Sequence, residues 1–147
     1  MGLNIRDIVP KKEITFENLR GKIIAVDAFN AIYQFLSSIR QYDGTPLQDK
    51  SGRVTSHLSG LFYRNLSLLQ EGIKLVYVFD GKPPELKFQT REKRIEVKES
   101  AKAKYDEAKE NEDYGAMKKY SQQTTKITKE IIAESKELLE AMGIAVI

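Results

Sequence analysis

Two short apolar runs rich in β-branched residues stand out in the chain, at residues 22–27 (KIIAVD) and 73–80 (IKLVYVFD), and each ends in aspartate. Runs of this length and composition predict buried strands. Helical patterns follow them at 29–40 and from about residue 86, and a third pattern at about 56–70 lies between the two runs, with apolar residues three and four apart. Strands that alternate with helices predict an α/β fold with a parallel sheet.

The second half of the chain has helical character but few apolar residues. Residues 86–126 include a break at about 111–115, which predicts a polar helical hairpin that projects from the core. From Ile127 the pattern becomes amphipathic, ends at Gly143 and gives way to the apolar residues 144–147. A chain that stops within such an apolar run is expected to be cut short.

Composition limits the chemistry that is open to this chain. Its 147 residues suit a single domain, and the absence of a long apolar run argues against a membrane span. The lack of cysteine excludes a disulfide scaffold, a thiolate zinc site and a cysteine nucleophile, and His57 is the only histidine. Any metal must therefore be held by carboxylates, which favours Mg²⁺ or Mn²⁺ and the chemistry of phosphate esters.

Asp27 and Asp80 are the first candidates for such a metal site. Each ends a predicted strand, and the carboxyl ends of parallel strands face the crevice in which ligands bind. One or two carboxylates are what a protein usually offers to Mg²⁺. The spacing leaves an alternative open, in which Asp27 caps the next helix and Asp80 with Gly81 makes a turn.

A basic stripe begins seven residues after Asp80. Residues 82–109 hold nine Lys or Arg and six acidic residues, a surplus of three that equals the net charge of +3 of the whole chain. At about 100° per residue, an arc of roughly 80° on one helix collects five cations: Lys87, Arg91, Arg94, Lys98 and Lys102. The stripe could steer a phosphate backbone toward the aspartates, whereas an ordinary solvated helix with ion pairs is the alternative.

Two further residues allow two interpretations each. Tyr33 is spaced to pack in the core with Phe29 and Leu36, or it could stack on a nucleobase. His57 stands in the first turn of its predicted helix after Thr55, where backbone N–H groups could receive a phosphate or the side chains could simply cap the helix.

Four segments together resemble the flap endonucleases of archaeal and eukaryotic type, in the structure-specific 5′ nuclease superfamily. They are residues 55–64 (TSHLSGLFYR), 76–87 (VYVFDGKPPELK), 32–35 (IYQF) and 39–41 (IRQ). The resemblance covers essentially the whole chain. It implies that residues 1–147 are the N-terminal part of a 5′-nuclease (PIN-like) domain, with a gateway helix and a helical arch at about 82–126.

The resemblance also implies roles for single residues. Asp27 and Asp80 match active-site carboxylates that hold two Mg²⁺ ions, for which Mn²⁺ can substitute, and Lys87 and Arg94 match the basic residues that contact the scissile phosphate. Other positions match DNA contacts: Gly2 near the metals, Tyr33 against a terminal base, Arg40 and Gln41 at the wedge against the bent duplex, Thr55 near a pocket for a one-nucleotide 3′ flap, and Arg64 on the backbone. Arg91 and Lys98 join this set through the basic stripe.

The implied activity is the cleavage of branched DNA with a 5′ flap by two-metal hydrolysis in replication and repair. A sliding clamp would bind the family's C-terminal tail, and the protein would work in the cytoplasm if archaeal or in the nucleus if eukaryotic. The chain stops just before the family's Glu-rich segment and lacks the usual second glycine near Gly2. We therefore expect it to need the remainder of the same enzyme. The alternatives are a related 5′ exonuclease or excision-repair nuclease, and a non-catalytic DNA-binding module.

Overall fold

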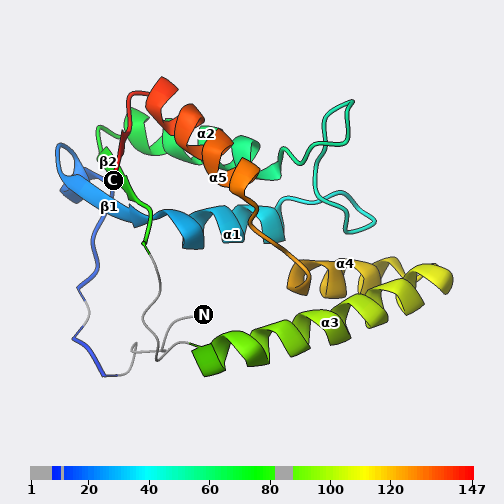
Figure 1. Ribbon diagram of the computed structural model, residues 1–147. Coiled ribbons are helices and arrows are strands. Elements are labelled where there is room, and N and C mark those ends of the chain that lie inside the picture. The colour runs from blue at the N-terminus through cyan, green and yellow to red at the C-terminus, as the bar shows by residue number, and fades with distance from the viewer. Residues whose placement is uncertain (1–7, 11, 82–87) are drawn as a thin grey trace.

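A three-stranded parallel sheet lies at one side of the molecule, at the left of Figure 1. The computed structural model describes residues 8–10, 12–81 and 88–147, with the backbone alone for 88–96. In this part of the chain the strands are ordered β1-β2-β3, with bounds Ile23–Asp27, Lys74–Val78 and Ala145–Val146. Ile23 lies opposite Lys74 and Asp27 opposite Val78. The α/β fold with a parallel sheet that the sequence predicted is confirmed.

The helices lie where the patterns predicted them. Gly72 and Gly143 follow the second and the last of the long helices with φ of 75° and 72°, the left-handed conformation that ends a helix. No helix in the described part of the chain is long and apolar enough to cross a membrane. In chain order the helices are the short 3₁₀ helix η1 (Glu17–Leu19), α1 (Ala28–Ser38), α2 (Ser56–Gln70), α3 (Phe88–Glu110), α4 (Tyr114–Gln123) and α5 (Lys129–Ala141).

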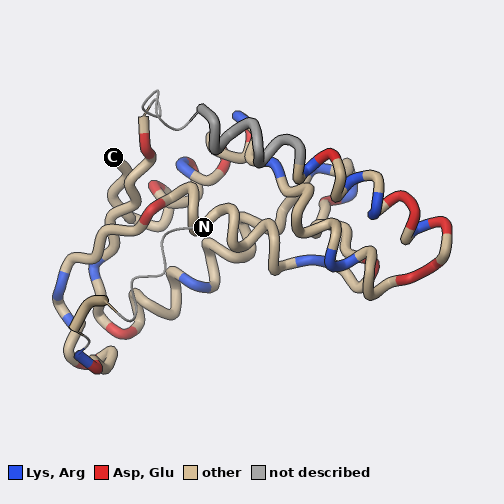
Figure 2. Tube along the Cα trace, turned by 90° about the horizontal axis from the view of Figure 1, so that it is seen from below, with Lys and Arg blue, Asp and Glu red and all other residues tan. Residues whose placement is uncertain are grey.

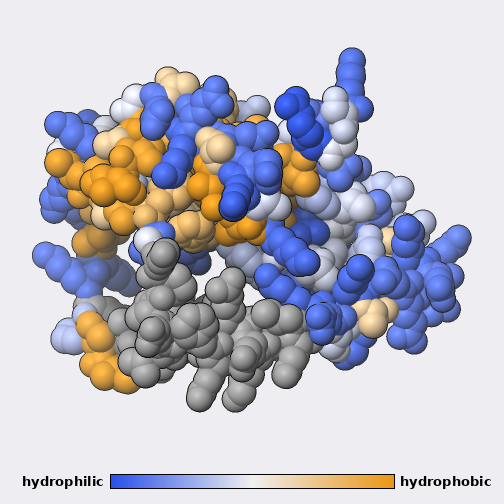
Figure 3. All heavy atoms as spheres, in the orientation of Figure 1, coloured by the Kyte–Doolittle hydropathy of each residue, from blue (hydrophilic) through white to orange (hydrophobic). Residues whose placement is uncertain are grey.

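The core lies between one face of the sheet and helices α1, α2 and α5. Leu75 and Tyr77 alternate along β2 and point into it, where they join Ile32 of α1, Leu61 of α2 and Leu139 of α5. Hydrophobic residues accordingly gather over the half of the molecule that holds the sheet, α2 and α5 (Figure 3). Burial of these apolar side chains is the main force that orders the strands.

The opposite face of the sheet is open within the described ranges. Ile23 is 70% exposed, and Ala25 and Ala145 are exposed as well. Parallel sheets are normally covered on both faces, so this face lacks the layer that such a sheet usually has.

The buried face of α2 differs in part from the predicted one. The spacing placed Phe62 and Leu66 on the apolar face, but they are 41% and 39% exposed. Asn65 belongs to the same predicted line and is fully buried, and its Oδ1 accepts a hydrogen bond of 2.8 Å from the hydroxyl of Tyr77. A tyrosine in the core needs a partner for its hydroxyl, and this need explains a buried amide on an otherwise apolar helix face.

The polar hairpin is formed by α3 and α4, which pack against each other (Figure 1). The sequence predicted that this hairpin would project from the core. Its turn does extend beyond the sheet and its covering helices, but α4 also contacts α1 along one side. In Figure 2 the acidic residues gather near the turn of the hairpin, which separates them from the basic residues nearer its base.

Helices α1 and α2 approach closely at Gly60. A Cβ built at Gly60 would overlap the ring of Phe35 and lie 2.6 Å from the Cβ of Phe35. Gly60 is therefore needed for the distance at which α1 packs on α2.

We predict that Gly60→Ala lowers the free energy of unfolding by about 1–3 kcal/mol, the usual cost of overpacking. Gly115→Ala is the matched control, because Gly115 is also helical and its Cβ would meet only Asp113 Oδ1 at 3.4 Å. The control should be neutral or stabilising by up to about 1 kcal/mol, since alanine favours the helix. Urea unfolding of both variants measures the difference, and equal effects would refute the close approach.

Candidate functional site

Asp27 and Asp80 lie at the same edge of the sheet. The parallel register sets Asp27 opposite Val78, and Asp80 follows two residues later on the neighbouring segment. With strands about 4.8 Å apart and about 3.3 Å per residue, the two Cα atoms are on the order of 8 Å apart. Both residues are exposed, so a ligand can reach this edge from solvent.

Asp27 also caps α1. Its Oδ1 accepts a hydrogen bond of 2.9 Å from the backbone N–H of Asn30. The capping interpretation of the sequence is therefore correct, but it does not exclude a metal, because a carboxylate has a second oxygen. The cap bond uses Oδ1 and leaves Oδ2 available for a ligand.

An aromatic contact, which the sequence analysis missed, joins the two aspartate segments. The rings of Phe29 and Phe79 meet edge to face with centroids 5.7 Å apart, and the ammonium of Lys136 lies 4.7 Å from the centroid of Phe79. The backbone N–H of Phe79 donates to the carbonyl of Ile147 at 2.8 Å. Phe29 is two residues from Asp27 and Phe79 is next to Asp80, so this contact restricts how far the carboxylates can separate. The positions of both phenylalanines beside the aspartates were the available signal.

The donor set at this edge fits Mg²⁺ or Mn²⁺, because it consists of carboxylates. Two carboxylates are too few for a two-metal site. Among the described residues no group of three or more His, Cys, Asp or Glu is placed to hold a metal ion. Further ligands would have to come from elsewhere.

Several predicted site residues have side chains outside the described part of the structure. Gly2 and Lys87 lie outside the described residues. Arg91 and Arg94 lie in the backbone of α3, but their side chains are not described. The described end of the basic stripe has a structural contact as well, because Lys98 Nζ donates to the carbonyl of Thr125 at 2.9 Å.

The remaining predicted DNA contacts lie along α1, its following loop and α2. Tyr33 is 39% exposed, so it is only partly packed against its neighbours. Gln41 and Arg64 are exposed, whereas Arg40 is half-buried. Tyr33 lies within α1, Arg40 and Gln41 follow its far end from Asp27, about 17 Å along the helix, and Arg64 lies on α2.

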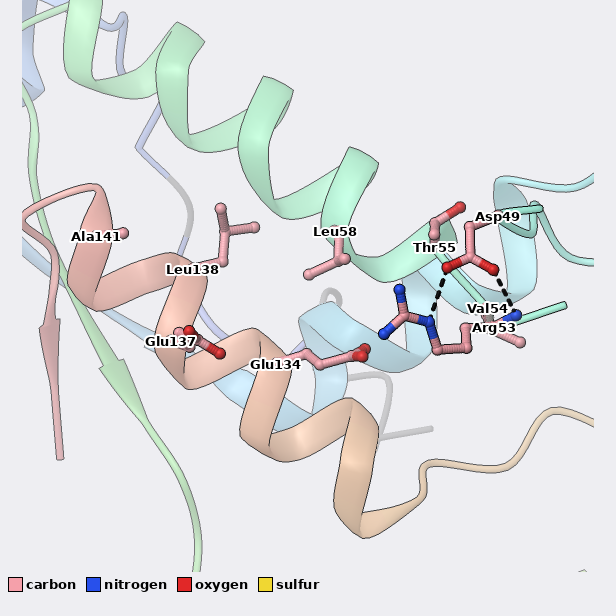
Figure 4. A pocket seen from close by; sticks show the side chains of 9 residues that line it. All are labelled: Asp49, Arg53, Val54, Thr55, Leu58, Glu134, Glu137, Leu138 and Ala141. Atoms are coloured by element: carbon pink, nitrogen blue, oxygen red, sulfur yellow. Dashed lines mark hydrogen bonds and ion pairs between the residues drawn. The ribbon is translucent and has the colours of Figure 1, made fainter. Parts of the chain in front are cut away.

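Thr55 lies beside a hollow of about 330 Å³ between the start of α2 and α5 (Figure 4). It occupies the N-cap position of α2 but makes no side-chain capping bond, contrary to the simplest interpretation of the sequence. On one side of the hollow Arg53 Nε donates to Asp49 Oδ2 at 2.8 Å, and Glu134 and Glu137 of α5 line the other side.

His57 neither caps α2 nor faces solvent. Its side chain is fully buried, and Nε2 lies 3.1 Å from Oε2 of Glu134 on α5. Nδ1 is also buried and has no hydrogen-bond partner among the described residues. Burial lowers the pKa of His57, and the nearby Glu134 opposes this effect only in part. The neutral ring is therefore the favoured form in the folded chain.

Because folding lowers the pKa of His57, we predict that the free energy of unfolding decreases as the pH is lowered. Between the folded pKa and the unfolded value of about 6.5 the unfolded chain binds more protons, so acidification through this window favours unfolding. Urea unfolding from pH 7 to pH 5 should show a loss of unfolding free energy that His57→Gln reduces. Identical slopes for the two proteins would contradict this prediction.

Asp43, Asp49 and Glu130 have lowered carboxyl pKa values, so they contribute to the loss of stability only at more acidic pH.

Known proteins resemble this chain in sequence and in structure. The model of the XPG N-terminal domain matches residues 4–101. Flap endonuclease 1 of Pyrococcus furiosus is 56% identical over 147 residues, which are 100% of this chain and 43% of that protein. The same enzyme of Hyperthermus butylicus is 52% identical over 147 residues, covering 98% of this chain and 42% of that protein.

Two solved structures extend the comparison. Flap endonuclease-1 from Methanococcus jannaschii superposes with a TM-score of 0.65 at 43% identity, covering 99% of this chain and 46% of that one. The catalytic core of Rad2 in complex with DNA substrate gives a TM-score of 0.56 at 29% identity, covering 92% of this chain and 31% of that one. The chain thus spans less than half the length of each of these relatives. It belongs to the XPG N-terminal domain family and is a homologue of flap endonuclease 1.

Proposed function

We propose that this chain supplies part of the active site of a structure-specific nuclease that removes 5′ flaps from branched DNA. The observation that carries the proposal is the parallel register of β1 and β2, which brings Asp27 and Asp80 to one exposed edge of the sheet. The similarity to flap endonuclease 1 over the whole chain supports the same activity.

In this proposal Asp27 and Asp80 hold Mg²⁺, or Mn²⁺ in its place. When bound, two such ions supply Lewis-acid stabilisation of charge at the scissile phosphate. The cap bond to Asn30 would orient the Asp27 carboxylate before a metal binds. The ring contact between Phe29 and Phe79 would limit the movement of the adjacent Asp80. Two carboxylates that are ordered before the substrate binds lose little conformational entropy when the metal and the phosphate bind.

Lys87 and Arg94 would offset the negative charge that develops on the phosphate. Their spacing of seven residues predicts that they share one face of a helix, at the end of the basic stripe that is nearest Asp80 in the sequence. Basic groups fixed beside the reacting phosphate act on the transition state more than on binding.

Duplex DNA would lie along α1 and the adjacent end of α2. Tyr33 is partly exposed and would stack on a terminal base. Arg40 and Gln41 follow α1 and lead into the loop that would wedge against the bent duplex. Arg64 would contact the backbone, and the hollow beside Thr55 would accept one unpaired 3′ nucleotide. A homologue, Rad2, has been solved with DNA substrate, which supports a nucleic-acid partner.

The remainder of the same enzyme would complete this site. The open face of the sheet, with Ile23 70% exposed, could accept a covering layer, and the two carboxylates need further ligands. We also propose that the complete enzyme binds a sliding clamp through its C-terminal tail. It would work in the cytoplasm of an archaeon or in the nucleus of a eukaryote.

We predict that the isolated 147-residue chain binds flap DNA weakly and does not cleave it, because two carboxylates cannot hold two metal ions. Incubation with a 5′-flap duplex and Mg²⁺, followed by denaturing electrophoresis, measures this. Cleavage that Asp80→Ala abolishes would show that the chain is sufficient and would contradict the prediction.

We also predict that Lys87→Ala or Arg94→Ala, in a full-length nuclease that contains this chain, lowers the single-turnover cleavage rate at least ~100-fold with a smaller loss of affinity. Lys102→Ala is the control farther along the stripe and should act mainly on affinity and its salt dependence. Cleavage at saturating enzyme and equilibrium binding in Ca²⁺ separate the two effects. Equal losses of affinity with near-normal rates in all three variants would make the stripe a steering surface only.

A further inference from the structure

Phe79 attaches the segment that carries Asp80 to the rest of the fold. Its backbone N–H donates to the carbonyl of Ile147 at 2.8 Å, which continues the pairing of β2 with β3 one residue beyond Val78. Its ring packs against the core and meets the ring of Phe29 edge to face. Asp80, the next residue, is exposed. The position of Asp80 therefore depends on how Phe79 is held.

The side of the sheet to which the Phe79 ring points also decides the side on which Asp80 lies. Side chains alternate between two faces along an extended strand, and Phe79 shares the covered face with the buried Tyr77. Alternation then predicts the other face for Asp80. Asp27 lies opposite Val78 in the parallel register, two residues before Asp80, so Asp27 and Asp80 share that face. A ring that left the core would turn the carboxylate of Asp80 away from Asp27.

A lysine of α5 holds the same ring. The ammonium of Lys136 lies over the ring of Phe79, 4.7 Å from its centroid, where the negative face of the ring attracts a cation. Lys136 is half-buried and follows the fully buried Ser135, so part of its aliphatic stem is covered while its charge reaches the ring. Phe79 is thus held from α1 by Phe29 and from α5 by Lys136.

The charge of Lys136 and its contact with the ring have opposite effects on a metal ion at Asp80. An ammonium near the segment that carries Asp80 disfavours a divalent cation there if it acts by charge alone, because like charges repel. Its contact with Phe79 favours the metal, because it keeps the carboxylate on the face that Asp27 shares. The two effects differ in sign, so an experiment can separate them.

We propose that Lys136 is a positioning residue for the metal site, which keeps Asp80 on the same face of the sheet as Asp27 by holding the ring of Phe79. The proposal rests on the proposed function, in which Asp27 and Asp80 are metal ligands. Lys136 acts through the ring and does not itself touch the metal or the DNA. Its effect on the order of the segment that carries Asp80 is present in the metal-free chain.

Backbone ¹⁵N relaxation of the metal-free chain tests whether Lys136 orders this segment. Lys136→Gln removes the charge, whereas Lys136→Arg keeps a cation that also binds aromatic faces. We expect Lys136→Gln to lower the order parameters of Asp80 and Gly81 toward the flexible range below about 0.6, with residues 74–78 unchanged. Lys136→Arg should remain near the wild type. Lys129→Gln should as well, and it is the matched control because Lys129 lies seven residues earlier on the same face of α5.

Titration with Mg²⁺ tests the consequence for the metal. The amide shifts of residues 26–30 report binding, and these residues belong to the segment of Asp27, which the variants do not alter. Lys136→Gln should weaken Mg²⁺ binding about two- to fivefold, the effect of losing a cation–π contact at a partly exposed site, and Lys136→Arg should restore it. In a Phe79→Leu background Lys136→Gln should add no further loss, because the ring through which it acts is gone.

Unchanged or tighter Mg²⁺ binding in Lys136→Gln would overturn the proposal, and tighter binding would show that the lysine acts by charge alone. Unchanged order parameters at Asp80 and Gly81, or an equal loss of affinity with and without the Phe79 ring, would overturn it as well. If Mg²⁺ shifts neither aspartate segment in the wild type, the proposed metal site fails. The relaxation of the metal-free chain then still decides whether Lys136 positions Asp80.

Discussion

Parallel pairing of β1 with β2 forces the chain to leave the carboxyl end of one strand and return to the amino end of the other. Residues 28–73 make this crossover with α1, a loop and α2, and the close contact at Gly60 lets the two helices share one face of the sheet. The same pairing puts the ends of both strands at one edge. Asp27 and Asp80 therefore come together through a property of the backbone, without a direct contact between their side chains.

The second crossover, from β2 to β3, contains three helices, although one helix is enough to connect two parallel strands. Helix α5 alone supplies the buried residues Ile131 and Leu139 that cover the sheet, so the α3–α4 hairpin is an insertion ahead of it. An insertion with few buried apolar residues is held by specific polar contacts, and Thr125 collects two of them.

Local features of the structure could be predicted from the sequence, and distant pairings could not. The positions of the strands and helices and the stop at Gly143 follow from periodicity and backbone preference, so they were found, although β2 ends at Val78 and not at Asp80. The burial of His57 depends on Glu134, 77 residues away, and no periodic pattern carries that information. Asp27 shows a second limit of prediction from sequence. The sequence offered a helix cap and a metal ligand as alternatives, whereas the geometry allows both roles at once.

Paramagnetic broadening by Mn²⁺ in a ¹⁵N-labelled chain tests most directly whether Asp27 and Asp80 share a cation, as we propose. Small additions of Mn²⁺ should broaden the amides of residues 26–30 and 78–81 together, because both segments would lie within reach of the same ion. Asp80→Asn should remove the broadening from both segments, including the one that it does not belong to. Broadening confined to one segment, or centred on the acidic residues near the turn of the hairpin, would contradict the claim.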